Sequence, residues 1–179
     1  MVSEVDIVSI PPDEAVIRRF SEELWLPYTR ELEATVSTFR LAEDIEDLLE
    51  EEEVAYRQSL LESDDYSGWV AVEDFDPETD DLTEDGTFVG FVTAQINEAP
   101  PVFDQPDMVT LGDIYIKEAY RGSGLADALV ERVVALADAH DCTVIKLEVD
   151  VDNERALAYY EKLGFEPHRF IMTVSTDEL

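Results

Sequence analysis

Hydrophobic and polar residues follow two different periods along this chain, and the period predicts a strand or a helix in each segment. Alternation with a period of two, or a short apolar run bounded by turn residues, predicts a strand. Apolar residues three and four positions apart predict the buried face of a helix. The predicted strands are residues 5–10, 68–75, 87–96, 109–116, 143–149 and 169–174. The predicted helices are one that starts at 11–14, one at 41–49 with an extension to 61, and two at 124–140 and 153–163.

The order of these elements, β-α-α-β-β-β-α-β-α-β, predicts a mixed α/β protein with helices packed on a sheet. Proline lacks an N–H group and clashes with the preceding turn, so Pro27 is expected to end or kink the first helix. An acidic turn at 76–86 joins two strands of a predicted hairpin, and three prolines within 98–107 predict a loop. No repeat or low-complexity linker divides the chain, so residues 1–179 are predicted to form a single domain.

The composition narrows the class of protein. The chain has 179 residues, with 44 Asp and Glu against 12 Lys and Arg, and a formal net charge of −32. The hydrophobic fraction of 45% still allows a buried core, so the acidity does not indicate disorder. General nucleic-acid binding needs a basic surface and is excluded. No apolar run is long enough to span a membrane and the first ten residues do not resemble a signal peptide, so a soluble cytoplasmic protein is expected.

Cysteine and histidine, the common ligands of protein-bound zinc, are scarce in this chain. Cys142 is the only cysteine, which excludes an intrachain disulfide, and His140 and His168 are not at ligand spacing. We therefore predict no metal site. Cys142 is expected to be a small buried hydrophobic residue.

The basic residues are three Lys and nine Arg. Strong negative charge with little Lys is typical of proteins from a salt-saturated cytoplasm, where salt screens the repulsion between acids. We therefore expect a halophilic source; the alternative is an acidic protein that binds cations or basic partners. The acidity is uneven, because residues 110–170 hold 12 acids and seven of the 12 bases. This segment is the part of the chain best suited to an anionic ligand.

A turn between a predicted strand and a predicted helix carries the clearest candidate chemistry. Its residues are Arg121, Gly122, Ser123, Gly124, Leu125 and Ala126. Glycines let backbone N–H groups approach a ligand, and a helix N-terminus adds unpaired donors and a partial positive charge. Arg121 can add a full charge and bidentate hydrogen bonds. These features predict a phosphate site; the alternative is a tight turn without a ligand. The Walker A and dinucleotide-binding patterns are both absent.

A second pattern follows the strand that ends near Asp150. Asn153 suits a helix N-cap, Ala156 and Tyr160 are four residues apart on one helix face, and Gly164 suits the C-cap. Together with the turn at 121–126, it resembles the GNAT superfamily of acyl-CoA-dependent N-acyltransferases. The resemblance is clearest over 110–167, and the cofactor-binding core is expected at about 109–167. The matching residues are Arg121, Gly124, Ala126, Asn153, Tyr160, Gly164 and Phe165.

The resemblance implies a fold, a cofactor and a site. The fold is a mostly antiparallel sheet with a splayed strand pair, and the cofactor is acetyl-CoA. The turn would bind the CoA pyrophosphate, and the strand at 114–116 would pair with the pantetheine arm. Trp25, Pro27 and Tyr28 would lie beside the acceptor pocket. The implied cofactor-binding residues are Ile114, Tyr115, Ile116, Arg121, Gly122, Ser123, Gly124, Leu125, Ala126, Asn153, Ala156 and Tyr160.

The implied reaction is direct attack of an amine on a thioester. An alkyl amine with a pKa of about 10.4 must first lose a proton, which requires a carboxylate base or a water chain. Tyr160 is the candidate general acid for the thiolate, and Glu148 and Asp113 are the candidate bases. The base of some relatives cannot be carried over, because Gly112 stands where their pattern has an acid.

The acceptor is the least determined part of the hypothesis. The strand Leu111–Ile116 resembles members that act on small molecules, so a small primary amine is favoured. The alternatives are a protein N-terminal or lysine acetyltransferase, a GNAT module that binds acyl-CoA without turnover, and a nucleotide-binding α/β protein. Many family members pair through their C-terminal strands, which makes a homodimer an expectation.

Overall fold

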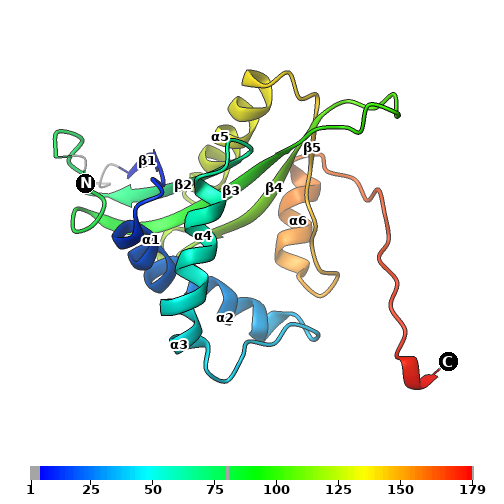
Figure 1. Ribbon diagram of the computed structural model, residues 1–179, viewed down its shortest axis with the longest axis horizontal. Helices are drawn as coiled ribbons and strands as arrows, with labels where there is room; N and C mark the ends of the chain where they lie inside the picture. The colour runs from blue at the N-terminus through cyan, green and yellow to red at the C-terminus, as the bar shows by residue number, and fades with distance from the viewer. Residues whose placement is uncertain (1–4, 80, 179) are drawn as a thin grey trace. The chain divides into compact units, whose positions relative to one another are not determined.

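The computed structural model describes residues 5–79 and 81–178; Met1 to Glu4, Asp80 and Leu179 lie outside the described residues (Figure 1). The chain divides into two compact units, Met1–Glu148 and Val149–Leu179, and each is described by itself. The first unit contains the sheet and most of the helices, and the second contains one α-helix and an extended tail.

Five strands form one sheet in the order β1-β2-β3-β4-β5. The four pairs are antiparallel except β4 with β5, which is parallel. This arrangement confirms the predicted mixed α/β, mostly antiparallel fold. The bounds are β1 (Val5–Ser9), β2 (Tyr66–Glu73), β3 (Thr87–Asn97), β4 (Met108–Ile116) and β5 (Val144–Lys146).

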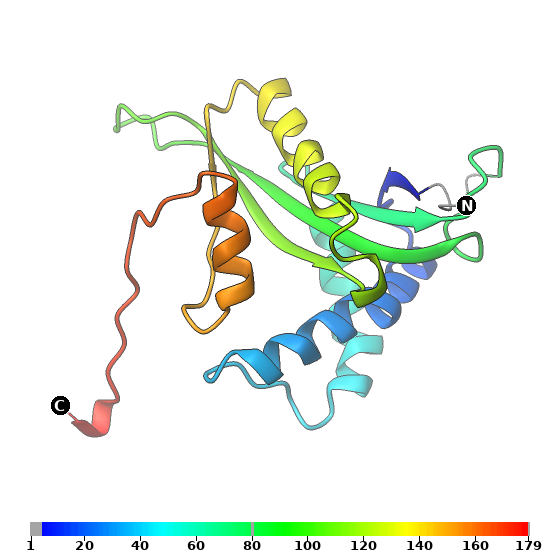
Figure 2. The same ribbon diagram turned by 180° about the vertical axis from the view of Figure 1, so that it is seen from behind.

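Helices cover both faces of this sheet (Figure 1, Figure 2). Helix α5 packs on one face, and α1, the η1 turn and α4 pack on the other. The bounds in the first unit are α1 (Glu14–Phe20), η1 (Ser21–Trp25), α2 (Leu26–Thr35), α3 (Ile45–Leu48), η2 (Leu49–Glu53), α4 (Val54–Leu61), η3 (Glu118–Tyr120) and α5 (Leu125–Ala139).

The central strand β3 is buried on both faces from Phe88 to Ala94, and it separates two apolar cores. Leu129 and Val133 of α5 lie in one core, and Phe20 packs edge-on against Phe91 at 4.8 Å in the other. Full burial of a side chain of this size is worth about 1.5–3 kcal/mol, so the two cores hold the helices firmly on the sheet.

The first helix does not end at Pro27. Helical structure continues from Glu14 to Thr35, and the irregularity falls in the π-helical turn Ser21–Trp25 before the proline. In this turn the N–H of Leu26 bonds to the carbonyl of Ser21. The wider turn accommodates a residue that has no N–H to donate, so the expectation of a helix end is wrong.

Arg19 on α1 holds the end of the acidic turn that precedes β3. Its guanidinium donates to the carbonyls of Leu82, Asp85 and Gly86 at 2.7–3.0 Å. The same group lies 4.1 Å from the centre of the Phe88 ring. One side chain therefore satisfies three backbone acceptors and joins the turn to the helix layer.

The second unit contains α6 (Glu154–Lys162) and the short η4 (Thr176–Glu178). The strand predicted at 169–174 is absent from it, and Phe170, Ile171 and Met172 are 80–91% exposed. A strand requires a partner, and no other described segment of this unit is a strand. The apolar pattern of residues 169–174 was therefore not enough to predict a strand correctly. The strand predicted at 143–149 is confirmed only over Val144–Lys146.

Candidate functional site

A β-bulge in β4 determines which side chains face the candidate site. Gly112 and Asp113 together oppose the single residue Thr93 of β3, and the Asp113 N–H donates to Thr93 Oγ1 at 2.9 Å. Because side chains alternate along a strand, the extra residue moves the following side chains to the other face of the sheet. Leu111 accordingly lies in the core beneath α5, whereas Asp113 and Tyr115 contact α2.

The bulge leaves no room for a side chain at position 112. A Cβ on Gly112 would lie 2.6 Å from Thr93 Oγ1, which is closer than real Cβ contacts. Moving Thr93 to relieve this contact would break its hydrogen bond with the Asp113 N–H. The bulge therefore gives a physical reason for a glycine at position 112.

Helix α2 contacts the second half of β4 through two polar side chains. The Tyr28 hydroxyl donates to Asp113 Oδ1 at 3.0 Å, and the Tyr115 hydroxyl donates to Glu31 Oε1 at 3.0 Å. Tyr28 and Glu31 are three residues apart, so they lie on one face of the helix. The rings of Tyr28 and Tyr115 pack at 5.8 Å between centroids.

Arg121 joins the glycine turn to this network. Its Nη2 lies 2.8 and 2.7 Å from the two carboxylate oxygens of Glu31, and its Nε donates to the Ile116 carbonyl at 2.9 Å. The guanidinium carbon lies 5.7 Å from the centre of the Tyr115 ring. Nη1 has no hydrogen-bond partner among the described residues, so it is the part of Arg121 that can reach an anion without disturbing Glu31.

The turn after Arg121 has the backbone geometry of an anion site. Gly122 and Gly124 have φ of 76° and 90°, a region that side chains other than glycine rarely adopt. The first backbone hydrogen bond of α5 runs from the Ala128 N–H to the Gly124 carbonyl, and the Leu125 N–H donates to Ser123 Oγ at 3.4 Å, so the Ala126 N–H lies in the first turn without an intrahelical acceptor. The helix has 15 residues, and its N-terminus carries a partial positive charge. The turn thus fits the phosphate groups of CoA.

Strand β4 extends well past its short parallel partner β5. β4 pairs with β5 only as far as Thr110, and β4 continues to Ile116. Lys117 donates to Val89, so by alternation the backbone groups of Tyr115 face β3, and those of Ile114 and Ile116 face the opposite side. The carbonyl of Ile116 is already bonded to Arg121. The backbone of Ile114 is therefore the best placed of the three residues to pair with an extended ligand.

Asn153 is the N-cap of α6 in the second unit. Its Oδ1 accepts a hydrogen bond from the Ala156 N–H at 3.2 Å, so the predicted cap is present. This contact gives Asn153 a structural role whether or not it touches a ligand.

Tyr160 lies in the second unit, on α6. Its side chain is 7% exposed, and its ring packs 5.7 Å from the rings of Tyr159 and Phe165. Gly164, with φ of 92°, ends the helix, and the N–H of Phe165 bonds to the Tyr160 carbonyl at 3.0 Å. The C-cap predicted at this glycine is therefore present, in the form of a Schellman motif that holds Phe165 against Tyr160.

Within the described part of the chain, the other candidate residues Glu148 and Cys142 do not contact the network of Asp113, Glu31 and Arg121. Glu148 is exposed, and no contact among the described residues joins it to Asp113 or Arg121. Burial raises the pKa of the Cys142 thiol, which fits a small hydrophobic residue and not a nucleophile. No group of three potential metal ligands occurs among the described residues, and no helix in this part of the chain could cross a membrane.

Glu31 is the site residue that the sequence did not reveal. It is one of 44 acids, and neither its own spacing nor a motif sets it apart. Tyr28 was recognised only as a residue near a pocket, without its contact to Asp113. The signal that could have revealed both residues is the three-residue spacing of Tyr28 and Glu31, which places them on one face of a helix. That face lies opposite the strand with Asp113 and Tyr115.

Comparison with known proteins agrees with this geometry. A family model described as "Acetyltransferase (GNAT) family" matches residues 35–165. An uncharacterized N-acetyltransferase of Methanocaldococcus jannaschii is 29% identical over 91 residues, which cover 46% of this chain and 40% of that protein. Mycothiol acetyltransferase of Corynebacterium glutamicum is 40% identical over 60 residues, covering 34% of this chain and 20% of that protein. The chain thus spans less than half the length of each relative.

Solved structures share the fold over nearly the whole chain. A mutant of a Bacillus halodurans protein, BH1408, has a TM-score of 0.71 at 20% identity and covers 95% of this chain and 98% of its own. Aminoglycoside N-acetyltransferase AAC(6')-Iy, solved in complex with CoA, has a TM-score of 0.66 at 19% identity. The match covers 98% of this chain and 97% of that protein. Since the family model covers well over half of the chain, the protein belongs to the GNAT family of acetyltransferases.

Proposed function

We propose that the protein transfers an acetyl group from acetyl-CoA to the primary amine of a small molecule. The observation that carries this proposal is the glycine turn at 121–126 at the N-terminus of α5, with Arg121 within it and β4 unpaired with β5 beyond Thr110. Membership of the GNAT family supports it, and so do the names of the relatives as N-acetyltransferases. The small-molecule acceptor is favoured by the aminoglycoside acetyltransferase fold neighbours.

Two parts of the cofactor have a matching group in the first unit. The backbone of the turn and Nη1 of Arg121 suit the pyrophosphate, while the Ser123 hydroxyl donates to the Tyr120 carbonyl at 2.7 Å. The backbone of Ile114 suits the amide-bearing pantetheine arm. Acetyl-CoA would supply the activated acyl group as a thioester. Gly122 and Gly124 keep the turn free of side chains that would block this approach.

Side chains of the protein are proposed to carry out the two proton transfers of the reaction. Tyr160 is the proposed general acid for the leaving thiolate, and Asn153 and Ala156 place its helix. The attacking amine must lose a proton, and Asp113 is the better placed of the two carboxylates proposed as bases. Tyr28 orients the Asp113 carboxylate, whereas Glu148 has no such partner among the described residues. A water chain from Asp113 to the amine is the simplest arrangement consistent with these contacts.

Thiol release from acetyl-CoA, screened over a panel of amines in molar KCl, tests the proposal. Tyr160→Phe is expected to lower kcat by about a hundredfold or more, the usual contribution of a general acid. Tyr159→Phe is the matched control, because its hydroxyl lies on the neighbouring ring. Full kcat in Tyr160→Phe across the pH range would remove the acid role, and no thiol release with any amine would contradict the proposed function.

A protein N-terminus is the second candidate acceptor. N-alpha-acetyltransferase 30 of Saccharomyces cerevisiae is 38% identical over 55 residues, covering 31% of this chain and 31% of that protein. A panel that includes peptides with free N-termini separates the two acceptor classes. Binding of acetyl-CoA without thiol release for any acceptor would instead indicate a non-catalytic module.

Two further proposals concern the cellular location and the oligomeric state of the protein. The acid-rich composition supports a salt-rich cytoplasm as its location. The exposed apolar residues Phe170, Ile171 and Met172 support a homodimer in which these segments are covered. Sedimentation in molar KCl measures the oligomeric state directly.

A further inference from the structure

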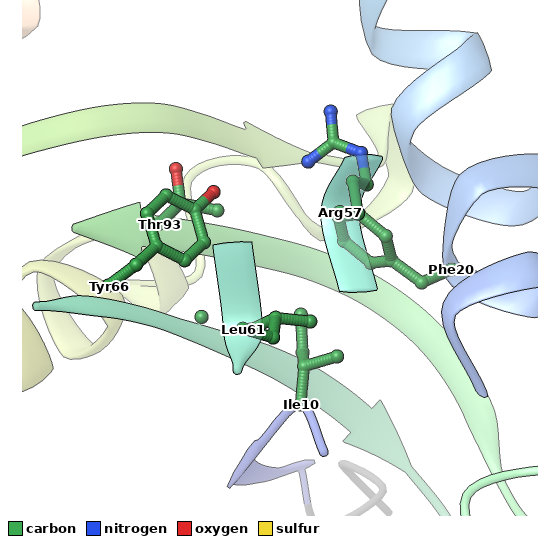
Figure 3. A pocket seen from close by; sticks show the side chains of 7 residues that line it. Ile10, Phe20, Arg57, Leu61, Tyr66 and Thr93 are labelled. Atoms are coloured by element: carbon green, nitrogen blue, oxygen red, sulfur yellow. The ribbon is translucent and has the colours of Figure 1, made fainter. Parts of the chain in front are cut away.

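Arg57 and Arg121 both lie over aromatic rings, but they differ in what can reach them. The side chain of Arg57 on α4 is 8% exposed, and the cavity that it lines in Figure 3 has room for about one water molecule. The side chain of Arg121 is 27% exposed. The glycines that follow it, Gly122 and Gly124, border open space, because a Cβ on either would meet no atom within 4 Å beyond the neighbouring residues. Of these two arginines, Arg121 is therefore the one that a ligand can contact.

Three contacts restrict the Arg121 side chain. Nε donates to the Ile116 carbonyl at 2.9 Å, and Nη2 lies 2.8 and 2.7 Å from the two carboxylate oxygens of Glu31. The guanidinium carbon lies 5.7 Å from the centre of the Tyr115 ring. These contacts fix the plane of the guanidinium and leave Nη1 as the nitrogen without a partner among the described residues. An anion can therefore bind Nη1 while the other contacts stay in place.

Glu31 is itself held in position on α2. Its Oε1 accepts a hydrogen bond from the Tyr115 hydroxyl at 3.0 Å. One helical turn earlier, the Tyr28 hydroxyl donates to Asp113 at 3.0 Å, so α2 is joined to β4 at two points. The Glu31 carboxylate thus lies between a strand residue and the first residue of the glycine turn. It is in place to orient Arg121 before any ligand binds.

A carboxylate beside an anion site has two opposing effects on binding. Holding one long side chain in place removes an ordering cost that is equivalent to about a two- to tenfold gain in affinity. Repulsion between the carboxylate and a phosphate opposes this gain. The Glu31 side chain is 37% exposed, and at about 1 M salt the Debye length is only about 3 Å, so salt largely screens the repulsion. In molar salt the ordering effect should therefore be the larger of the two.

We propose that Glu31 is a positioning residue for the cofactor: it holds the Arg121 side chain so that Nη1 is available to the pyrophosphate of acetyl-CoA. The inference rests on the proposed role of the glycine turn in binding this group. Glu31 acts through Arg121 in this role and does not need to touch the cofactor. Helix α2, which also carries Tyr28, thereby contributes to cofactor binding.

Dissociation constants for CoA and for pantetheine test this inference. Pantetheine lacks the pyrophosphate and the nucleotide, so the position of Arg121 should not affect its binding. Titration calorimetry in molar KCl is expected to show that Glu31→Ala raises the dissociation constant for CoA about two- to tenfold and leaves that for pantetheine unchanged. Glu31→Gln keeps one of the two acceptor oxygens and should have an intermediate effect on CoA.

A double-mutant cycle and a matched control assign the effect to the contact. In an Arg121→Gln background, Glu31→Ala should leave the dissociation constant for CoA unchanged, because the side chain that it positions is gone. Glu46→Ala is the matched control and should not change CoA binding. Glu46 also pairs with an arginine of α2, Arg30, but both side chains of that pair are exposed.

Several outcomes would overturn the inference. An equal loss for CoA and pantetheine would make the role of Glu31 structural only, and tighter binding of CoA by Glu31→Ala would show that repulsion dominates. A loss that persists in the Arg121→Gln background would show that Glu31 does not act through Arg121. If Glu31→Ala does not fold, Tyr115→Phe removes the hydroxyl that holds Glu31 and keeps the ring and the backbone. It should weaken the binding of CoA and not of pantetheine, and unchanged binding of CoA would refute the inference.

The same measurements separate this inference from the proposed function. Binding needs no acceptor, so thiol release that fails with every amine would contradict acetyl transfer and leave the binding test intact. A wild-type protein that does not bind CoA would overturn the proposed function, and the role of Glu31 with it. CoA binding that is unchanged in Glu31→Ala would overturn the role of Glu31 alone.

Discussion

Replacing Gly112 by Ala should destabilise the protein through one identifiable contact. The new Cβ would lie 2.6 Å from Thr93 Oγ1, so the threonine must rotate and release the Asp113 N–H. Leaving this part-buried N–H without its partner costs about 1–3 kcal/mol. Alanine restricts the unfolded chain and offsets about 0.4–1 kcal/mol of this, since Gly112 does not have a left-handed φ. The net loss is about 1–2 kcal/mol in the free energy of unfolding.

A double-mutant cycle with Thr93→Ala isolates the contact. Thr93→Ala removes the hydroxyl, so Gly112→Ala in that background should be neutral or stabilising by up to about 1 kcal/mol. Denaturant unfolding at constant KCl gives the four free energies, and thermal melting should show a fall of roughly 2–8 °C for Gly112→Ala alone. If Gly112→Ala costs the same in both backgrounds, the clash with Thr93 is not the cause, and the account of the bulge is refuted.

Three other expectations follow from the same network and from the composition. The half-buried pair Glu31–Arg121 should show a coupling of about 1 kcal/mol in a cycle of Glu31→Gln and Arg121→Gln, measured by denaturant unfolding; strictly additive losses would contradict it. The pKa of Tyr66 is raised by burial above its ordinary value near 10, so the folded state holds this proton longer and stability should fall as pH rises above about 10. Tyr66→Phe should flatten that fall in the free energy of unfolding, and an unchanged slope would show that Tyr66 is not responsible. Raising KCl from about 0.1 M to about 1 M shortens the Debye length from about 10 Å to about 3 Å, so the melting temperature should rise; a flat response would count against adaptation to salt.

Much of the fold was predictable because its signals are local. Alternation and helical spacing located most strands and helices of the first unit, and Gly124 and Gly164 marked a helix start and a helix end. The glycine turn at 121–126 was predictable for the same reason, since its residues are adjacent in the sequence; its role in cofactor binding stays a prediction. Of the two outcomes predicted for Pro27, a helix end is wrong, because the π-helical turn Ser21–Trp25 accommodates the proline, and rules for single residues do not anticipate such a turn.

The contacts across the site depend on long-range pairing, which local patterns do not contain. The bulge opposite Thr93 turns Asp113 toward α2, and a single chain read for alternation would place Asp113 with Leu111. Glu31 lies 90 residues before its partner Arg121, and nothing in its neighbourhood distinguishes it from other acids. The strand predicted at 169–174 is absent for a related reason, because a strand forms only where a partner strand is available to pair with it.

The hydrogen bonds and ring contact of Arg19 limit which residues could replace it. Arg19, Arg57 and Arg121 each lie over an aromatic ring, and Arg19 and Arg121 also bond to backbone carbonyls. A lysine has one donor nitrogen and no flat surface, so it could keep the charge at these sites but neither the stacking nor the forked hydrogen bonds. Arg-to-Lys exchange, usually treated as the mildest of changes, is therefore a structural change at these positions. At these three positions the choice of arginine over lysine therefore follows from the contacts of the side chain.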